Sequence, residues 1–238
     1  MSNDADLTNY DSIAELFINH ARQPDYWNNL YERPYMLGKL PQLRGKNVLD
    51  LGCATGFYTE HTLKERANVT AVDASQKLID RLASEIKSPK LKLFCADISK
   101  PMPFLESDSF DCIICSLVLD YIKDWDALLN ELYRVVNKGG QLIISIVHPF
   151  ASYLHIKPDS YYDFKLVEDD WGGHHGIAFK THYYIRPMNE VFRPIIKSEF
   201  DIVSIEEMLP DEGLKETHPE PYQRLIERPG FLFIMLER

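Results

Sequence analysis

A short apolar run followed by a glycine loop is the feature that most constrains this chain. Residues 48–51 (VLDL) are apolar apart from Asp50, and residues 52–56 (GCATG) follow directly, before apolar and helix-forming residues resume. A buried strand, a glycine-rich turn and the start of a helix form the unit with which many α/β folds bind a nucleotide. The sequence therefore predicts a nucleotide site at this turn, and the open question is which nucleotide.

Further apolar runs continue the pattern after the glycine loop. They are rich in Val, Ile, Leu and Phe and alternate only weakly, which is typical of strands buried on both faces. Helical patterns lie between several of them: Ser75 is placed to cap one helix, and Gly139 and Gly140 are expected to end another. Alternating strands and helices predict an α/β fold with a doubly wound, mostly parallel sheet. The five predicted strands are residues 47–51, 69–73, 91–95, 110–115 and 141–147.

Two regions depart from this alternation and suggest how the chain is organised. Residues 1–45 are predicted to form a helical N-terminal cap, and residues 46–147 the nucleotide-binding core. Residues 148–187 are rich in Tyr, Phe, Trp and His and are too long for an ordinary connection, so we expect a lid or substrate insertion. Residues 188–238 are expected to complete the sheet, within one structural domain overall.

Charge and cysteine usage exclude several classes of function. The formal net charge of the 238 residues is -10, which disfavours nucleic acid and anionic membranes as partners. No apolar run approaches the roughly 18 residues of a membrane span, and the acidic N-terminus does not resemble a signal peptide. Cysteines placed in or beside core segments fit a reducing cytoplasm. No metal site is indicated, and the oligomeric state is not encoded in any recognisable pattern.

Carboxylates follow three successive predicted strands and narrow the choice of nucleotide. Asp50 lies at the glycine loop, Asp73 lies 21 positions after Gly52, and Asp97 follows the third strand. Phe57 occupies the third glycine position of a dinucleotide fingerprint, and a carboxylate at Asp50 would repel a pyrophosphate. It suits an ammonium or sulfonium ligand instead, while Asp73 can accept from ribose hydroxyls and Asp97 from an adenine amino group. Each of the last two also has a local interpretation, as a helix cap or a turn residue.

Several motifs in order resemble a known family. They are VLDLGCATG, VTAVDAS, LFCADI, SFDCIICSLVLDYI and LYRVVNKGGQLIISIVHP. Over roughly residues 8–150 the chain is similar to class I S-adenosylmethionine-dependent methyltransferases, and most similar to their type 11 small-molecule group. Ala54 replaces the usual middle glycine, and Lys138 replaces a usual proline. The resemblance implies a Rossmann-like sheet of seven strands, with the last strand antiparallel and inserted beside the sixth.

The resemblance also implies a set of cofactor contacts. S-adenosyl-L-methionine would bind with its methionine part at the glycine loop, its ribose at Asp73 and its adenine near Asp97, and S-adenosyl-L-homocysteine would be the product. Residues at the end of the fourth strand would face the sulfonium and the methyl group. The implied cofactor-binding residues are Asp50, Gly52, Cys53, Ala54, Gly56, Asp73, Ala74, Ser75, Asp97, Ile98, Ser116, Leu117 and Val118.

The acceptor of the methyl group is expected to be a small molecule. The chain lacks the N-P-P-Y motif and the Pro-Cys dipeptide expected of methyltransferases that act on nucleobases, and its aromatic insertion suits a lid. His148, directly after the fifth strand, is the candidate catalytic residue, as a base or a substrate hydrogen bond; the alternative is a turn histidine satisfied by the backbone. The candidate substrate and lid residues are Tyr26, Tyr31, His148, Trp171, His182 and Tyr183.

Two other functions stay open at this point. One is an NAD(P)-dependent oxidoreductase on a similar sheet, against which the loop register and Asp50 argue. The other is a non-catalytic module that binds S-adenosylmethionine, which no sequence feature excludes. The leading prediction is an enzyme that transfers a methyl group from S-adenosylmethionine to a small acceptor by in-line displacement.

Overall fold

The computed structural model describes residues 14, 18, 27–170 and 180–238. In this part of the chain, seven strands form one sheet with the order β3-β2-β1-β4-β5-β9-β8. β9 runs antiparallel to both of its neighbours, and the other paired strands are parallel. The strands are β1 (Asn47–Leu51), β2 (Asn68–Asp73), β3 (Leu91–Cys95), β4 (Phe110–Ser116), β5 (Val136–Val147), β8 (Asp201–Glu207) and β9 (Phe231–Glu237). The predicted Rossmann-like methyltransferase sheet is thereby confirmed, including the inserted last strand.

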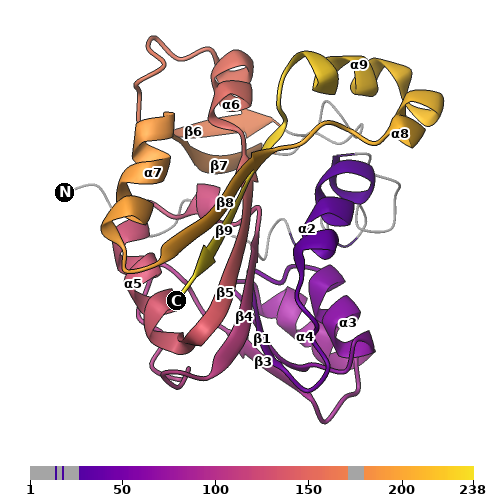
Figure 1. Ribbon diagram of the computed structural model, residues 1–238, viewed down its shortest axis with the longest axis vertical. Helices are drawn as coiled ribbons and strands as arrows, with labels where there is room; N and C mark the ends of the chain where they lie inside the picture. Colours follow the sequence, from indigo (N-terminus) through magenta and orange to yellow (C-terminus); the bar gives the residue numbers. More distant parts are fainter. Residues whose placement is uncertain (1–13, 15–17, 19–26, 171–179) are drawn as a thin grey trace.

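Helices cover both faces of the sheet (Figure 1). The helices α2 (Arg33–Lys39), α3 (Phe57–Lys64) and α4 (Gln76–Glu85) lie on one side, and α5 (Trp125–Val135) and α7 (Met188–Lys197) lie on the other. The other helical elements in the described part of the chain are η1 (Asn28–Glu32), η2 (Leu119–Tyr121), α6 (Pro149–Ile156), α8 (Glu212–Thr217) and α9 (Pro219–Glu227). None of these helices is both long and apolar enough to cross a lipid bilayer.

The core explains why the strands are apolar without strict alternation. Val48 packs in the cluster under α2 and α3, whereas Leu49 packs in the cluster under α5 and α7, so both faces of the sheet are buried. Cys112 and Cys115 follow the same rule and lie in opposite clusters. All four cysteines of the sequence lie in the described residues and are free thiols. Cys112 and Cys115 are therefore buried core residues on opposite faces of the sheet.

The expected stop of α5 at Gly139 and Gly140 is wrong. The helix ends at Val135, because Val136 adopts extended backbone and pairs with Phe110 at the start of β5. Gly139 has φ +76° and lies where the pairing of β4 and β5 shifts register, so these glycines serve a strand irregularity. Helices α8 and α9 are not anticipated by the sequence analysis.

The segment after β5 forms a small unit at the carboxyl end of the parallel strands. Helix α6 follows β5, and β6 (Lys165–Asp170) pairs antiparallel with β7 (Lys180–Ile185). Figure 1 shows this two-stranded hairpin and α6 together at one end of the main sheet. β7 contacts η2, the turn that follows β4. The insertion expected after the fifth strand therefore lies at the edge where α/β sheets bind ligands.

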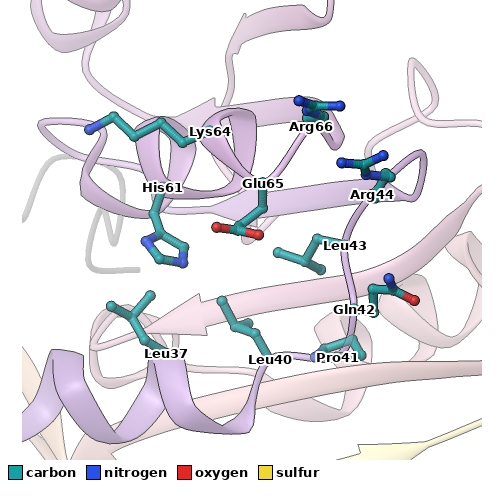
Figure 2. Close-up of a pocket in the computed structure, with 10 residues that line it drawn as sticks. All are labelled: Leu37, Leu40, Pro41, Gln42, Leu43, Arg44, His61, Lys64, Glu65 and Arg66. Atoms are coloured by element: carbon teal, nitrogen blue, oxygen red, sulfur yellow. The ribbon is translucent and has the colours of Figure 1, made fainter.

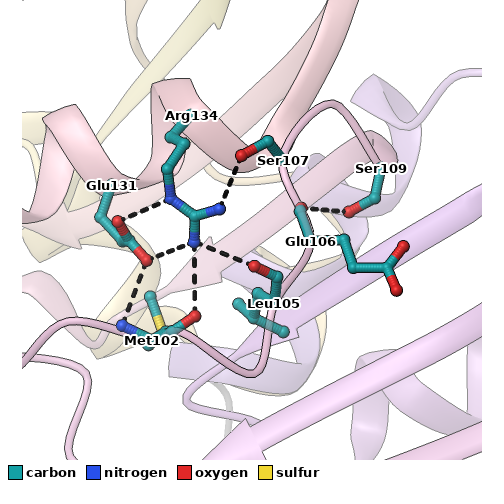
Figure 3. A network of polar contacts seen from close by, with 7 residues as sticks. All are labelled: Met102, Leu105, Glu106, Ser107, Ser109, Glu131 and Arg134. Atoms are coloured by element: carbon teal, nitrogen blue, oxygen red, sulfur yellow. Dashed lines mark hydrogen bonds and ion pairs between the residues drawn. The ribbon is translucent and has the colours of Figure 1, made fainter.

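A polar network connects α5 to the loop between β3 and β4 (Figure 3). The guanidinium of Arg134 donates to the Leu105 carbonyl at 3.0 Å, to the Met102 carbonyl at 3.3 Å and to the Ser107 hydroxyl at 2.9 Å. Glu131 accepts from the same guanidinium and from the Met102 backbone N–H. One planar side chain thus satisfies several groups of a loop that has no secondary structure of its own.

We expect Arg134→Ala to lower the free energy of unfolding by about 2 kcal/mol, because hydrogen bonds to a charged group are lost and carbonyls are left without a donor. Urea denaturation followed by circular dichroism measures this. Arg193→Ala is the control, since the polar contacts of Arg193 with described residues are exposed ion pairs with Glu190 and Asp126. Equal losses in the two variants would show that the Arg134 network contributes no more than a surface ion pair.

Candidate active site

The glycine loop between β1 and α3 depends on three residues with positive φ. Gly52 has φ +74°, Ala54 +46° and Gly56 +86°. A Cβ at Gly52 would lie 2.5 Å from the Val118 side chain, and one at Gly56 would collide with Leu82 of α4. The two glycines are therefore required by backbone conformation and by packing against protein side chains.

Asp73, the last residue of β2, joins the loop to the start of α4. Its Oδ2 accepts from the Ala54 N–H and its Oδ1 from the Ser75 N–H, both at 2.9 Å. Ser75 in turn caps α4 by accepting from the Leu78 N–H, as the sequence predicts, while the intervening Ala74 accepts from the Cys95 thiol. Asp73 therefore fixes the glycine loop and the start of α4 relative to the end of β2.

Asp50 is the fourth residue of β1 and is buried beside the glycine loop. Its side chain is 2% exposed, and the Thr59 hydroxyl in the first turn of α3 donates to it at 2.6 Å. Burial raises the pKa of Asp50 to about 6, against the lowering effect of the Thr59 hydrogen bonds. Burial also raises the pKa of the neighbouring Cys53 thiol well above its ordinary value, so this thiol is unreactive. Both residues support the loop from within.

Asp97 lies after β3 and is exposed. It accepts from the Ser99 backbone N–H at 2.9 Å and from the Ser99 hydroxyl at 2.6 Å. These contacts are those of a turn residue, as the local interpretation of Asp97 predicts. Its second carboxylate oxygen is available to a ligand, and the adjacent Ile98 is buried and apolar. A turn role and an adenine contact are compatible at this position.

The end of β4 brings a carboxyl group into the site that the sequence analysis missed. Glu32, the last residue of η1, accepts from the Ser116 hydroxyl at 2.7 Å, the Ser145 hydroxyl at 2.6 Å and the Tyr58 hydroxyl at 2.7 Å. Its side chain is 1% exposed. In the turn that follows β4, Leu117 has φ +51°, and the side chain of Val118 lies against Gly52. No local motif marks Glu32, because its partners lie on three other elements.

The charges at this edge fit a cationic ligand. Asp50, Asp73, Asp97 and Glu32 place four carboxyl groups at or beneath the carboxyl ends of β1 to β5, with donors that are hydroxyls and backbone N–H groups. A pyrophosphate would require the opposite charge. A ligand that carries an ammonium and a sulfonium, two ribose hydroxyls and an exocyclic amine matches this set of acceptors.

Comparison with known proteins identifies the class. Residues 49–144 match the family model of a methyltransferase domain. An S-adenosylmethionine-dependent methyltransferase from Mesorhizobium loti has the same fold, with a TM-score of 0.72 at 23% identity over 89% of this chain and 99% of that one. Residues 49–144 thus match a methyltransferase domain, and the described chain has the fold of S-adenosylmethionine-dependent methyltransferases.

Two relatives by sequence differ in how far the likeness extends. An uncharacterized protein of Haemophilus influenzae is 28% identical over 98% of this chain and 97% of its own length. The ubiquinone biosynthesis O-methyltransferase of Coxiella burnetii is 31% identical, but the match covers 52% of this chain and 54% of that protein. The chain thus spans about half the length of this O-methyltransferase.

His148 is buried, and both of its ring nitrogens have polar neighbours. Nδ1 accepts from the Phe150 N–H and caps α6, and Nε2 lies 2.8 Å from the Glu207 carboxylate. Burial lowers the pKa of His148, although Glu207 opposes this. The cap matches the alternative of a turn histidine satisfied by the backbone, and a role as a base stays a prediction.

The remaining candidate lid residues divide between core and surface. Tyr31 is buried, stacks on Phe231 with ring centroids 5.5 Å apart, and donates to the Met208 carbonyl at 2.5 Å. It therefore packs η1 against β9. Tyr26 and Trp171 lie outside the described residues.

Tyr183 and His182 are neighbours in β7 and point to opposite faces of the hairpin. Tyr183 is buried and donates to Asp169 at 3.0 Å, whereas the more exposed His182 lies 3.5 Å from Glu168. The buried face of the hairpin packs on η2. Only Tyr183 of this pair is positioned toward the carboxyl edge of the sheet.

A buried arginine joins the hairpin to the turn after β4. Arg186 donates to the carbonyls of Ile122 and Lys123, and its guanidinium lies 4.8 Å from the Trp125 ring and 4.4 Å from the Phe164 ring. Asp120 accepts from the Val147 N–H at 3.0 Å, and burial raises its pKa to about 6. These contacts place the insertion firmly over the ends of β4 and β5.

A cavity of about 450 Å³ lies away from the glycine loop, at the other end of the strands (Figure 2). It is lined by the segment that leads into β1 and by the end of α3, including Arg44, His61 and Lys64. Both segments are at the amino ends of the strands. The cavity is therefore not part of the glycine-loop site.

We expect Asp50→Asn to change how stability depends on pH. Asp50 ionises near its ordinary value of 3.8 in the unfolded chain but near 6 in the folded protein, so the free energy of unfolding of the wild type falls as pH rises between these values. The variant lacks this loss. Its free energy of unfolding relative to the wild type should rise across that interval by up to about 3 kcal/mol, measured by urea denaturation at successive pH values.

Glu206→Gln is a control for which the difference in unfolding free energy from the wild type should change with pH in the opposite direction. Hydrogen bonds from Lys39 and then Tyr35 lower the pKa of Glu206 to about 2, so its stabilising effect is present above its ordinary value and is lost as pH falls toward 2. This variant should become less stable relative to the wild type as pH rises. A flat difference for Asp50→Asn would contradict the assigned burial effect.

Proposed function

We propose that this protein transfers the methyl group of S-adenosylmethionine to a small organic acceptor bound beneath the β6–β7 hairpin. The observation that carries the proposal is the carboxylate of Asp73 at the end of β2, which accepts from the glycine loop at Ala54 and from the start of α4 at Ser75. When bound, the cofactor supplies an electrophilic methyl group on a positively charged sulfur. Asp97 and Ile98 would flank the adenine, and the glycine loop would receive the methionine part.

The chemistry asks the protein to align the reacting groups and to exclude water. Arg186 and Asp120 support the hairpin over the ends of β4 and β5, which suits both tasks. Residues 46–147 would bind the cofactor, and residues 148–187 would cover the acceptor. The enclosed edge, the net charge of -10 and the likeness to a ubiquinone biosynthesis O-methyltransferase support a small molecule over a nucleic acid. The free thiols support a cytoplasmic location.

The first experiment is calorimetric titration with S-adenosylhomocysteine. The wild type should show saturable binding, and Asp73→Asn should bind about tenfold or more weakly, since a charged acceptor for the ribose hydroxyls is replaced by a neutral amide. Asp80→Ala, on the exposed face of α4, should bind like the wild type. Folding of each variant is checked by circular dichroism.

Two results would count against the assignment of Asp73 and the cofactor. A folded wild type that does not bind S-adenosylhomocysteine would overturn the cofactor assignment, and binding of NADH in its place would revive the oxidoreductase. Unchanged affinity in Asp73→Asn would remove Asp73 from the site. Turnover with a panel of small hydroxylated, amine and thiol acceptors then separates an enzyme from a module that only binds the cofactor.

His148 is tested with the acceptor found in that panel. Removal of a general base lowers kcat by about 10² to 10⁴, whereas loss of a helix cap lowers stability with a small effect on kcat. His148→Asn preserves a side-chain acceptor for the Phe150 N–H. Because the ring is already engaged with Phe150 and Glu207, we expect kcat of this variant within about tenfold of wild type. A kcat lowered by about 10² or more in a folded variant would establish His148 as a base.

A further inference from the structure

Glu32 is a buried carboxyl group to which neither the fold nor the reaction assigns a task. It is 1% exposed, and its two oxygens accept from hydroxyls on three elements: Tyr58 on α3, Ser116 on β4 and Ser145 on β5. A glutamate that served only to attach η1 to the sheet would carry an unnecessary charge, because an amide or an apolar side chain would do so at lower cost.

The charge of Glu32 is poorly compensated among the described residues. Burial raises the pKa of Glu32, and the hydrogen bonds of Ser145, Ser116 and Tyr58 lower it. The positive charge of Arg33 also lowers this pKa, but by less than each of these hydrogen bonds. The guanidinium of Arg33 is directed elsewhere: it lies 4.1 Å from the Phe57 ring centroid and donates to Asn29. Hydroxyl groups stabilise a carboxylate without neutralising it. Its negative potential is therefore available to a cation in the adjoining site.

The partners of Glu32 border the glycine loop on two sides. Tyr58 is the second residue of α3, directly after the loop, and Ser116 is the last residue of β4. Val118, two positions after Ser116, lies against Gly52. Glu32 thus contacts the groups that flank the loop at which the methionine part of the cofactor is expected.

We propose that Glu32 is a specificity-determining residue, whose buried negative charge makes the site prefer the cationic methyl donor over the neutral thioether product. The inference rests on the proposed function of this site. The donor and the product differ by one methyl group and one positive charge, so the shape of a pocket distinguishes them weakly. A buried carboxylate distinguishes them by charge, and it favours release of the product once the sulfonium has become a thioether.

The test compares the affinities of S-adenosylmethionine and S-adenosylhomocysteine by calorimetric titration, without acceptor. Glu32→Gln keeps the size of the side chain and an oxygen that can accept from both serines, but removes the charge. The variant should bind S-adenosylmethionine about tenfold more weakly and S-adenosylhomocysteine with less than about a twofold change, as expected for loss of one buried charge interaction.

Ser145→Ala is the matched control. It removes one hydrogen bond of Glu32 and leaves the charge, so it should change both affinities alike and leave their ratio as in the wild type. Glu32→Asp, which keeps the charge, should retain the preference for S-adenosylmethionine. A structural role for Glu32 predicts instead that Glu32→Gln and Ser145→Ala weaken both ligands equally.

Arg33→Ala provides a second test of the role of Glu32 if Glu32→Gln does not fold. Removal of this cation leaves the site more negative, so the preference for S-adenosylmethionine should increase by about twofold. An unchanged ratio in folded Glu32→Gln, or in Arg33→Ala where the first variant is unfolded, overturns the inference. Absence of binding of both ligands to the wild type would overturn the proposed function itself, which separates the two failures.

Discussion

The carboxylate of Asp73 is the interaction on which the geometry of the cofactor edge depends. It accepts from the backbone of Ala54, a residue that adopts positive φ without being glycine, and the hydrogen bond offsets part of the cost of that conformation. The same group accepts from Ser75 at the start of α4. Because Asp73 ends β2, the shape of the glycine loop follows from the pairing of β1 with β2. A ligand that binds Asp73 therefore meets a loop whose conformation is already determined.

The acidic groups beneath the loop show how the protein keeps a negative site without neutralising it. The Thr59 hydroxyl donates a hydrogen bond to Asp50, and the Tyr58 hydroxyl donates one to Glu32. These two donors are consecutive residues in the first turn of α3. Burial raises the pKa of both carboxyl groups, which makes their ionised forms costly in the absence of a cation. Such groups lower the stability of the free protein while they favour a cationic ligand. This is a trade between stability and function that is common at binding sites.

The parts of the structure that follow from local rules are the parts that the sequence predicts. The apolar runs became strands, Ser75 caps the helix it precedes, and Asp73 lies at the end of β2. Glu32 could not be found in this way, since it is 84 positions from Ser116 and 113 from Ser145. Gly139 resembles a helix stop until the irregular pairing of β4 with β5 is known. Local patterns likewise place His148 correctly after β5 but cannot reveal that it contacts Glu207 on β8.

The position of β9 between β5 and β8 has a consequence for how the chain reaches this fold. β8 is made before β9, yet among the described strands its sheet neighbour is β9 alone. Until residues 231–237 are available, β8 has no strand to pair with, and the apolar edge of β5 stays open. Ile202, Val203 and Ile205 of β8 are partly exposed even in the finished sheet. The nascent protein therefore passes through a stage with two unpaired apolar strands, in which association with other chains competes with completion of the sheet.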